Sequence, residues 1–142
     1  MRPTPRVSRF SDWPERLALI LESRAATPFQ WGVQDCVTFA ADVAQALTGV
    51  DLIARYRGTY DSEEGAAAIV GDIGLQAFLT VLMEENGAAE CPLPFAQRGD
   101  WALVTLGNHL IAGVVVGDTV AAPGLRGLAH VPVSRAVAAW VI

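Results

Sequence analysis

The spacing of apolar residues changes once along this chain, after Pro94. Before that point, apolar residues recur every three or four positions, as they do along one face of a helix. After it come short runs rich in β-branched residues, within 101–105 and 110–116 among others, divided by Gly, Asn and Pro. Helices followed by strands are typical of an α+β domain. We therefore expect N-terminal helices packed on a C-terminal antiparallel sheet.

The helical half contains several predicted helices. The first runs from about Asp12 to Arg24, and the second begins at or near Cys36 and ends at Gly49. Two more are predicted, one within 60–70 and one within 75–86. The second helix is rich in alanine and other apolar residues, so we expect it to lie in the middle of the domain, against the sheet.

The composition predicts one ordered domain. Of the 142 residues, 52% are apolar and 18% are charged, which gives enough apolar surface to offset the entropy lost on folding. Residues 1–10 contain two prolines and three arginines, so we expect an extended arm there and a domain over 11–142. Such an arm is either a frayed terminus or a segment that becomes ordered along a partner.

Charge and hydropathy argue against several functions. The net charge is −5 and the ten basic residues are scattered, which does not suit nucleic-acid binding. The longest unbroken apolar run, at 110–117, suits a buried strand, so we expect no membrane insertion. The N-terminus lacks the apolar segment of a secretory signal, which predicts synthesis and folding in the cytoplasm. His109 and His130 are too far apart for a compact ligand set, so no metal and no cofactor are expected.

Cys36 is the residue best placed for chemistry. It follows Asp35 at the expected start of a helix, where free backbone N–H groups and the helix dipole stabilise a thiolate and can receive an oxyanion. This position predicts a lower pKa than that of Cys91, which we expect in a more accessible loop. We expect both cysteines to be free thiols. The alternative for Cys36 is a small buried side chain, because free cysteine is often buried.

The sequence around Cys36 resembles the active-site entry of the NlpC-type cell-wall peptidases, a papain-like group of cysteine hydrolases. Pro28-Phe29, Trp31-Gly32 and Asp35-Cys36 match the family's Pro-Tyr, aromatic-Gly and Asp-Cys elements before a helix. "QRGDWALV" at 97–104 resembles the strand entry before the family's central hairpin. The order of elements agrees over roughly residues 14–142. The resemblance implies a single papain-like domain.

The match is strongest with small NlpC-like domains encoded among the tail genes of tailed phages, prophages and gene-transfer particles. Those proteins tend to carry "FAQRGD", "AAPG" and "AAW", present here at 95–100, 121–124 and 138–140. The resemblance implies a viral protein of the tail tip or baseplate, made in the host cytoplasm and located in the virion tail. Its implied partners are other tail-tip and hub proteins, and peptidoglycan.

The resemblance also implies roles for individual residues. Cys36 would be the nucleophile, with Asp35 and Trp31 as oxyanion or positioning residues. A cysteine hydrolase also needs an imidazole near the sulfur, and His109 is the candidate base. Phe29 stands where the family usually has a tyrosine, so its hydroxyl is missing here.

Two positions of the family's pattern are filled by residues that cannot do the same chemistry. The family's histidine position falls on Ile111, and the polar residue that orients the histidine falls on Ala121. His109 lies two residues before Ile111 and would need a β-bulge to approach the sulfur. His130 is expected to be a hydrogen-bonded structural histidine.

These departures leave two functions from different classes. The sequence favours a structural tail component that keeps the hydrolase fold with a degenerate active site. The alternative is an active cysteine endopeptidase or amidase that opens peptidoglycan during cell-wall penetration, with Cys36 and His109 as its catalytic pair.

Overall fold

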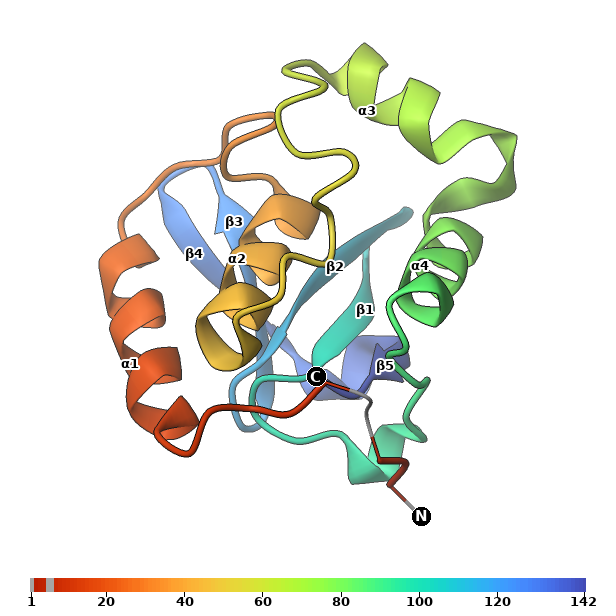
Figure 1. Ribbon diagram of the computed structural model, residues 1–142. Coiled ribbons are helices and arrows are strands. Elements are labelled where there is room, and N and C mark those ends of the chain that lie inside the picture. Colours follow the sequence, from red (N-terminus) through yellow and green to blue (C-terminus); the bar gives the residue numbers. More distant parts are fainter. Residues whose placement is uncertain (1, 5–6) are drawn as a thin grey trace.

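Helices precede the sheet in the computed structural model, which describes residues 2–4 and 7–142 (Figure 1). The α-helices are α1 (Trp13–Arg24), α2 (Cys36–Thr48), α3 (Glu63–Val70) and α4 (Gly74–Glu85). Short 3₁₀ turns lie at Gly71–Ile73, Leu93–Phe95 and Val133–Arg135. The strands are β1 (Trp101–Leu106), β2 (His109–Val115), β3 (Thr119–Gly124), β4 (Gly127–Pro132) and β5 (Ala136–Trp140). The predicted α+β class and order of elements are confirmed.

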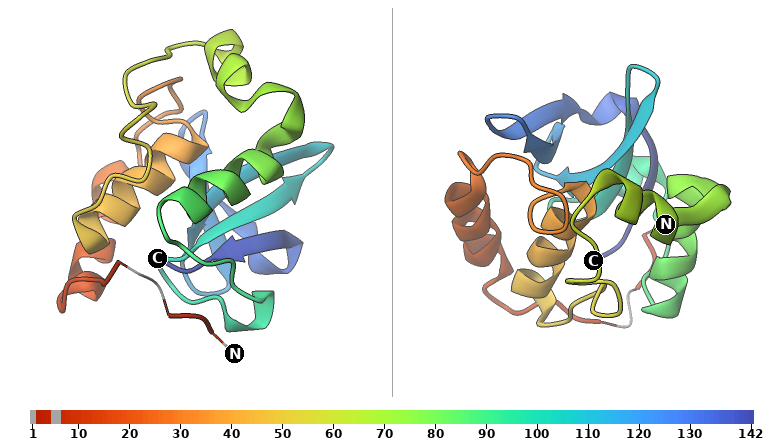
Figure 2. Two further views of the ribbon diagram at one scale, coloured as in Figure 1. Left: turned by 45° about the vertical axis from the view of Figure 1, so that its right-hand side comes forward. Right: turned by 90° about the horizontal axis from the view of Figure 1, so that it is seen from above.

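Within the described part of the chain, the strands form one antiparallel sheet in the order β4-β3-β2-β1-β5. Figure 2 shows the helices gathered on one side of this sheet. The main core lies between them, and its large members are Phe39, Leu47, Leu79, Met83, Trp101, Leu103 and Trp140. The opposite face of the sheet carries a smaller cluster of Ala102, Val104, Val115, Val120 and Val131.

Helix α2 starts at Cys36 because Asp35 caps it. The Asp35 carboxylate accepts the N–H groups of Val37 and Thr38 at 3.1 and 2.9 Å, and Thr38 Oγ1 accepts the Asp35 N–H at 2.8 Å. This reciprocal arrangement is a capping box. Gly49 ends the helix in the left-handed conformation, with φ of 79°. The predicted bounds of this helix are confirmed.

The middle of α2 is fixed against the sheet. Phe39, Ala40, Val43 and Ala44 are fully buried, as expected for a helix inside the domain. Trp101 of β1 donates its indole N–H to the carbonyl oxygen of Ala40 at 2.9 Å. The start of α2 therefore has a fixed position relative to β1 and β2.

The described residues of the N-terminal arm lie against their own domain. Arg2 and Arg9 both pair with Asp100, whose side chain is fully buried. Arg9 also donates to the carbonyl oxygen of Ile142 at 2.6 Å, and the Phe10 N–H donates to the carbonyl oxygen of Leu47 at 2.7 Å. Residues 1, 5 and 6 of the predicted arm lie outside the described residues.

The stretch Glu63–Glu85 is long and apolar enough to cross a membrane, judged by length and composition alone. The longest unbroken apolar run, at 110–117, did not point to this stretch, and the expectation of no membrane insertion stays a prediction. The stretch is not one straight helix, since Gly71 and Gly74 separate α3 from α4 with φ of 69° and 86°. Leu79 and Met83 of α4 are fully buried in the core.

Candidate functional site

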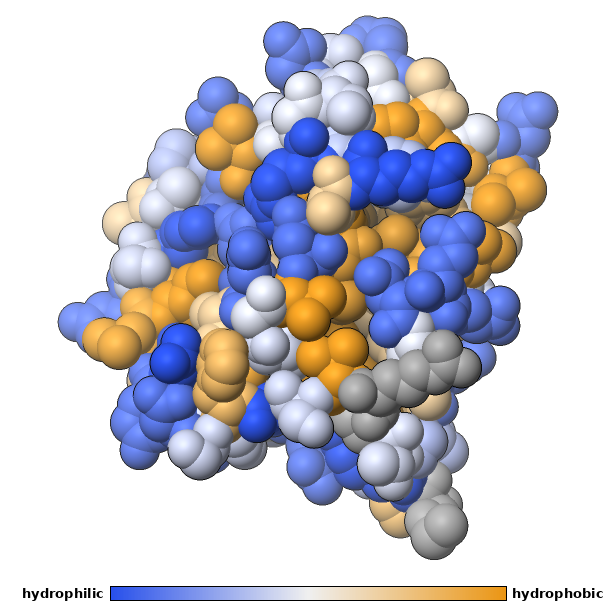
Figure 3. Space-filling view, viewed as in Figure 1, coloured by the Kyte–Doolittle hydropathy of each residue, from blue (hydrophilic) through white to orange (hydrophobic). Residues whose placement is uncertain are grey.

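A cleft of about 440 Å³ lies at the start of α2. Its walls come from the loop before α2, from α3 and the first turns of α4, and from β2 and β3. Figure 3 shows apolar side chains in the region between α2, α3 and α4, bordered by hydrophilic ones. The residues that line the cleft include Phe29, Trp31, Asp35, Cys36, Tyr60, Glu63, Ile69, Val70, His109, Leu110, Ile111 and Pro123.

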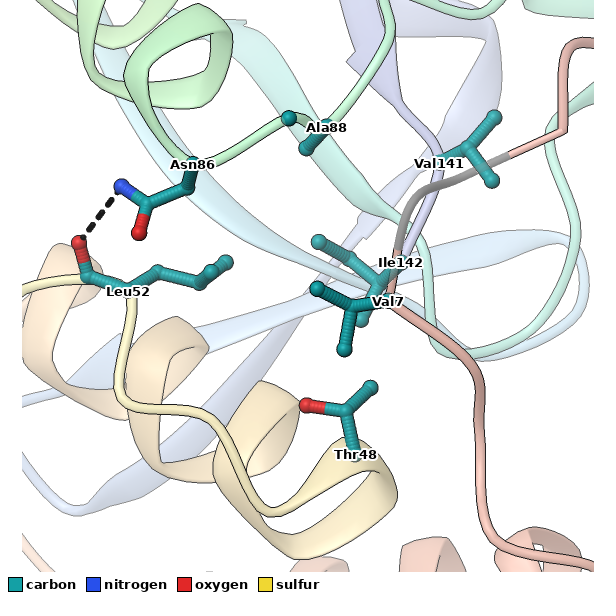
Figure 4. Close-up of a pocket in the computed structure, with 8 residues that line it drawn as sticks. Val7, Thr48, Leu52, Asn86, Ala88, Val141 and Ile142 are labelled. Carbon is teal, nitrogen blue, oxygen red and sulfur yellow. Dashed lines mark hydrogen bonds between the residues drawn. The ribbon is translucent and has the colours of Figure 1, made fainter.

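A second, much smaller cavity lies where the arm meets the C-terminus. It measures about 10 Å³, close to the space of one water molecule. Figure 4 shows Val7, Val141 and Ile142 around it, with Asn86 donating to the carbonyl oxygen of Leu52 at 3.1 Å. This cavity is a packing gap, and the larger cleft is the candidate site.

The Asp35 carboxylate connects three segments that line the cleft: the loop before α2, the start of α2 and the chain at Tyr60. Besides capping α2, this carboxylate accepts the Gly32 N–H at 2.9 Å and the Tyr60 hydroxyl at 2.6 Å. Burial and this hydrogen bond to Asp35 raise the pKa of Tyr60 well above its usual value. Gly32 has φ of 80°, and a Cβ there would lie 2.2 Å from the carbonyl oxygen of Tyr60. Gly32 and Asp35 of the motif therefore have a structural role, because they fix the conformation of the loop before α2.

The Trp31 side chain stands against a neighbouring ring. Its ring and that of Phe29 meet edge to face, with centroids 4.8 Å apart. Both rings line the cleft. Trp31 therefore contributes an apolar wall, and the oxyanion or positioning roles of Trp31 and Asp35 stay predictions.

The Cys36 thiol lies in the cleft and is half-buried. Burial raises its pKa to about 11, and the nearby charge of Asp35 acts in the same direction. The backbone groups of Ala112, Val37 and Cys36 itself lower the pKa, but by less than burial raises it. The prediction that the helix start lowers the pKa of Cys36 was therefore wrong. Desolvation of the thiol raises this pKa by more than the backbone N–H groups at the helix start lower it.

Cys91 also differs from expectation. It is 2% exposed, where we expected an accessible loop cysteine. Burial raises the pKa of its thiol as well. Both cysteines are free, as predicted.

His109 begins β2 at the end of the β1–β2 hairpin. The strands pair without a register shift, from Leu106 opposite His109 to Trp101 opposite Val114. The β-bulge that His109 would need to approach the sulfur is therefore absent from this hairpin. His109 and Ile111 both border the cleft. No side-chain hydrogen bond joins Cys36 and His109, both of which belong to the described residues.

Side-chain alternation explains why His109 does not meet the sulfur. Ala112 and Val114 belong to the core that contains α2, whereas Ile111 packs in the cluster on the opposite face. His109 lies two positions from Ile111 on the same strand, and side chains at that spacing lie on the same face. The His109 side chain therefore belongs to the opposite face of the sheet from α2. Leu110 and Ala112 occupy the β2 positions on the Cys36 side, and neither can serve as a base.

The family's orienting position, Ala121, carries no polar group, and the second histidine, His130, lies elsewhere on the sheet. Ala121 is fully buried opposite Val114, on the α2 side of the sheet. His130 is exposed on β4, with Nδ1 3.3 Å from Thr119 Oγ1. The prediction that His130 is hydrogen-bonded is confirmed.

Tyr60 is the site residue that the sequence analysis missed. It lies 25 positions after Asp35, and no local pattern marks its hydroxyl as the partner of that carboxylate. It precedes α3, which buries none of its side chains. The Tyr60 hydrogen bond therefore ties the chain leading into α3 to the start of α2.

Replacing Tyr60 with phenylalanine is expected to loosen α3 while leaving α2 capped, because Asp35 keeps its backbone donors. The lost bond to a charged acceptor should lower the free energy of unfolding by about 1.5–3 kcal/mol. Hydrogen exchange should become faster over 61–70 and stay unchanged at the start of α2. Tyr56→Phe is the matched control, since Tyr56 also lines the cleft. Equal exchange over 61–70 in both variants would show that the Tyr60 hydroxyl does not hold α3.

Together these features define an α+β domain with an apolar cleft at a helix that opens on Asp-Cys. The chain belongs to the family described as "Domain of unknown function (DUF6950)", whose model matches residues 8–142. Searches of curated proteins and of solved structures found no match.

Proposed function

We propose that this protein is a tail-tip or baseplate component of a phage-type particle, with an NlpC-like papain fold whose cleft no longer hydrolyses peptides. The sequence motifs around Cys36 and at 97–104 support the family and its setting. The placement of a cysteine at the start of a helix packed on an antiparallel sheet agrees with that fold.

One observation carries the non-hydrolytic part of this proposal: the β2 residues on the Cys36 side of the sheet are Leu110 and Ala112. A cysteine hydrolase acts through its thiolate, which a neighbouring imidazole generates and maintains. Here the pKa of Cys36 is about 11, so the thiol is protonated at neutral pH. Removing the base of such a catalytic group typically costs several orders of magnitude in rate.

An active peptidoglycan endopeptidase or amidase is the second candidate. The observation that favours it is that Cys36 and His109 border the same cleft. A rotation of the end of the β1–β2 hairpin would be needed to bring the imidazole to the sulfur. In that case, His109 would be the base and Cys36 the nucleophile.

Digestion of purified peptidoglycan separates the two candidates. We expect the wild-type protein to release no more muropeptides than Cys36→Ala or His109→Ala does. We also expect Cys36→Ala to enter assembled particles as the wild type does, because the change removes one small sulfur from a site not used for chemistry. Robust cleavage by the wild type that both substitutions abolish would overturn this proposal and establish the enzyme.

A further inference from the structure

Among residues 2–4 and 7–142, no strand pairs with one edge of β2 where this strand borders the cleft. On its other edge, β2 pairs with β1 from His109 to Val114. Toward β3, the pairs are Val114 opposite Ala121 and Val115 opposite Val120, at the far end of the strand. The next hydrogen-bonded position would place Ala112 opposite Pro123, and proline has no N–H to donate. Beyond it, the Gly124 carbonyl oxygen accepts the Phe29 N–H at 2.8 Å, so β3 has turned toward the loop before α2.

The hairpin geometry tells which backbone groups face this free edge. The β1–β2 turn consists of Gly107 and Asn108, and Gly107 has φ of 61°, as in a type II′ turn. The pair that closes such a turn, Leu106 and His109, exchanges its hydrogen bonds across the hairpin. Because bonded and non-bonded pairs alternate, the N–H and C=O groups of Leu110 and Ala112 point away from β1, toward the cleft.

Of these two residues, Leu110 is the more exposed. The Ala112 backbone lies beside Cys36 and affects its thiol. Leu110 is 37% exposed, and none of the backbone bonds found outside the regular elements of residues 2–4 and 7–142 involves it. The N–H and C=O groups of Leu110 thus lie side by side at this edge. One residue of an added antiparallel strand can form hydrogen bonds with both.

The walls around this edge suit apolar side chains. Phe29 and Trp31 form one wall, and Ile69 and Val70 of α3 contribute to another. The carboxylate of Asp35 already has its hydrogen-bond partners, which leaves Glu63 as the cleft's available acid. An occupant with acidic side chains would meet repulsion there, whereas a neutral or basic one would not.

We propose that this cleft binds an extended, apolar peptide segment of a partner protein, which adds as a strand to the free edge of β2 at Leu110. The inference rests on the proposed function, because a cleft that does not hydrolyse peptides can hold one as an assembly contact. Backbone bonds to Leu110 fix the direction and register of the segment, and the apolar walls select its side chains. A cleft of about 440 Å³ accommodates a short segment of this kind.

The test uses the full chain with Cys91→Ala, so that Cys36 is the single thiol. The probe is a library of acetylated and amidated pentapeptides built from Ala, Val, Leu, Phe and Arg. Binding is measured by calorimetry and by protection of Cys36 from alkylation. We expect apolar members to bind and to protect Cys36. If no member binds at millimolar concentration, the inference is overturned.

Leu110→Pro is the discriminating variant. It removes the N–H group that faces the cleft and leaves the β1–β2 bonds in place, because those bonds come from the neighbouring residues. We expect it to weaken binding of the best peptide about tenfold, the value of one hydrogen bond. Leu110→Ala is the matched control, since it shortens the side chain but keeps the N–H, and it should weaken binding less. Equal affinities for wild type and Leu110→Pro would contradict strand addition.

A peptide-side control keeps the test valid if Leu110→Pro does not fold. Methylating each amide nitrogen of the best peptide in turn should identify one position where wild-type binding falls about tenfold. Uniform tolerance of all methylated peptides would overturn the inference. Binding with cleavage would refute the non-hydrolytic function and leave strand addition intact. Absence of both binding and peptidoglycan digestion would refute strand addition alone.

Discussion

Replacing Asp100 with alanine is expected to lower the free energy of unfolding by about 3–5 kcal/mol, the cost of breaking a buried ion pair by removing one partner. The Asp100 side chain is fully buried and pairs with Arg2 and Arg9. It also accepts the backbone N–H groups of Gln97 and Ile142 at 2.8 and 3.1 Å. Alanine would leave these donors without their acceptor at the junction of both chain ends.

Urea unfolding followed by circular dichroism measures this effect. The matched control is Asp12→Ala, which breaks an exposed pair with Arg16 at 2.7 Å. Such surface pairs contribute about 0–1 kcal/mol, so the control should be close to wild type. A loss for Asp100→Ala no larger than that for Asp12→Ala would show that the buried pairs do not hold the chain ends together.

The Asp100 contacts also affect how a deletion of the N-terminal arm must be interpreted, because the deletion would remove two of them. Deleting residues 1–10 would test whether the arm docks on a neighbouring protein. In this structure, the deletion would also take Arg2 and Arg9 away from the buried carboxylate. A loss of particle incorporation could then arise from a destabilised domain. The free energy of unfolding of the truncated protein must therefore be measured beside its incorporation.

The parts of the fold that depend on local signals could be predicted from the sequence. Asp35 and Gly49 mark the two ends of α2 because capping and left-handed glycine act within a few residues. The change of period after Pro94 separates helices from strands for a similar reason. The break between α3 and α4, by contrast, depends on Gly71 and Gly74, whose positive φ values were not predicted.

The site was harder to predict because its properties depend on contacts between distant segments. The spacing of His109 and Ile111 indicated that their side chains lie on the same face of the strand. It did not show which face of the sheet packs against α2. The structure places Ala112 on that face, and side-chain alternation puts Leu110 there with it. The raised pKa of Cys36 likewise results from burial, and that burial is a property of the folded chain.

The thiol of Cys36 is expected to titrate near pH 11 in the folded protein, two units above its ordinary value of 9.0. At neutral pH, the thiolate fraction should then be about 100-fold lower than that of an ordinary cysteine, and alkylation correspondingly slower. The rate in the Cys91→Ala protein should rise about tenfold per pH unit up to about pH 11. Iodoacetamide labelling followed by mass spectrometry measures this profile.

The same shift predicts a pH dependence of stability with a definite sign. A raised pKa means that the fold favours the protonated thiol, so this contribution is present below pH 9 and is lost as pH rises toward 11. The wild-type protein should therefore lose more stability than Cys36→Ala over that range, because alanine has no proton to release. The urea-unfolded protein, labelled in parallel, should titrate near the ordinary value. An inflection of the folded protein's labelling below pH 8 would instead indicate an activated thiolate, and would favour the hydrolase with His109 as its base.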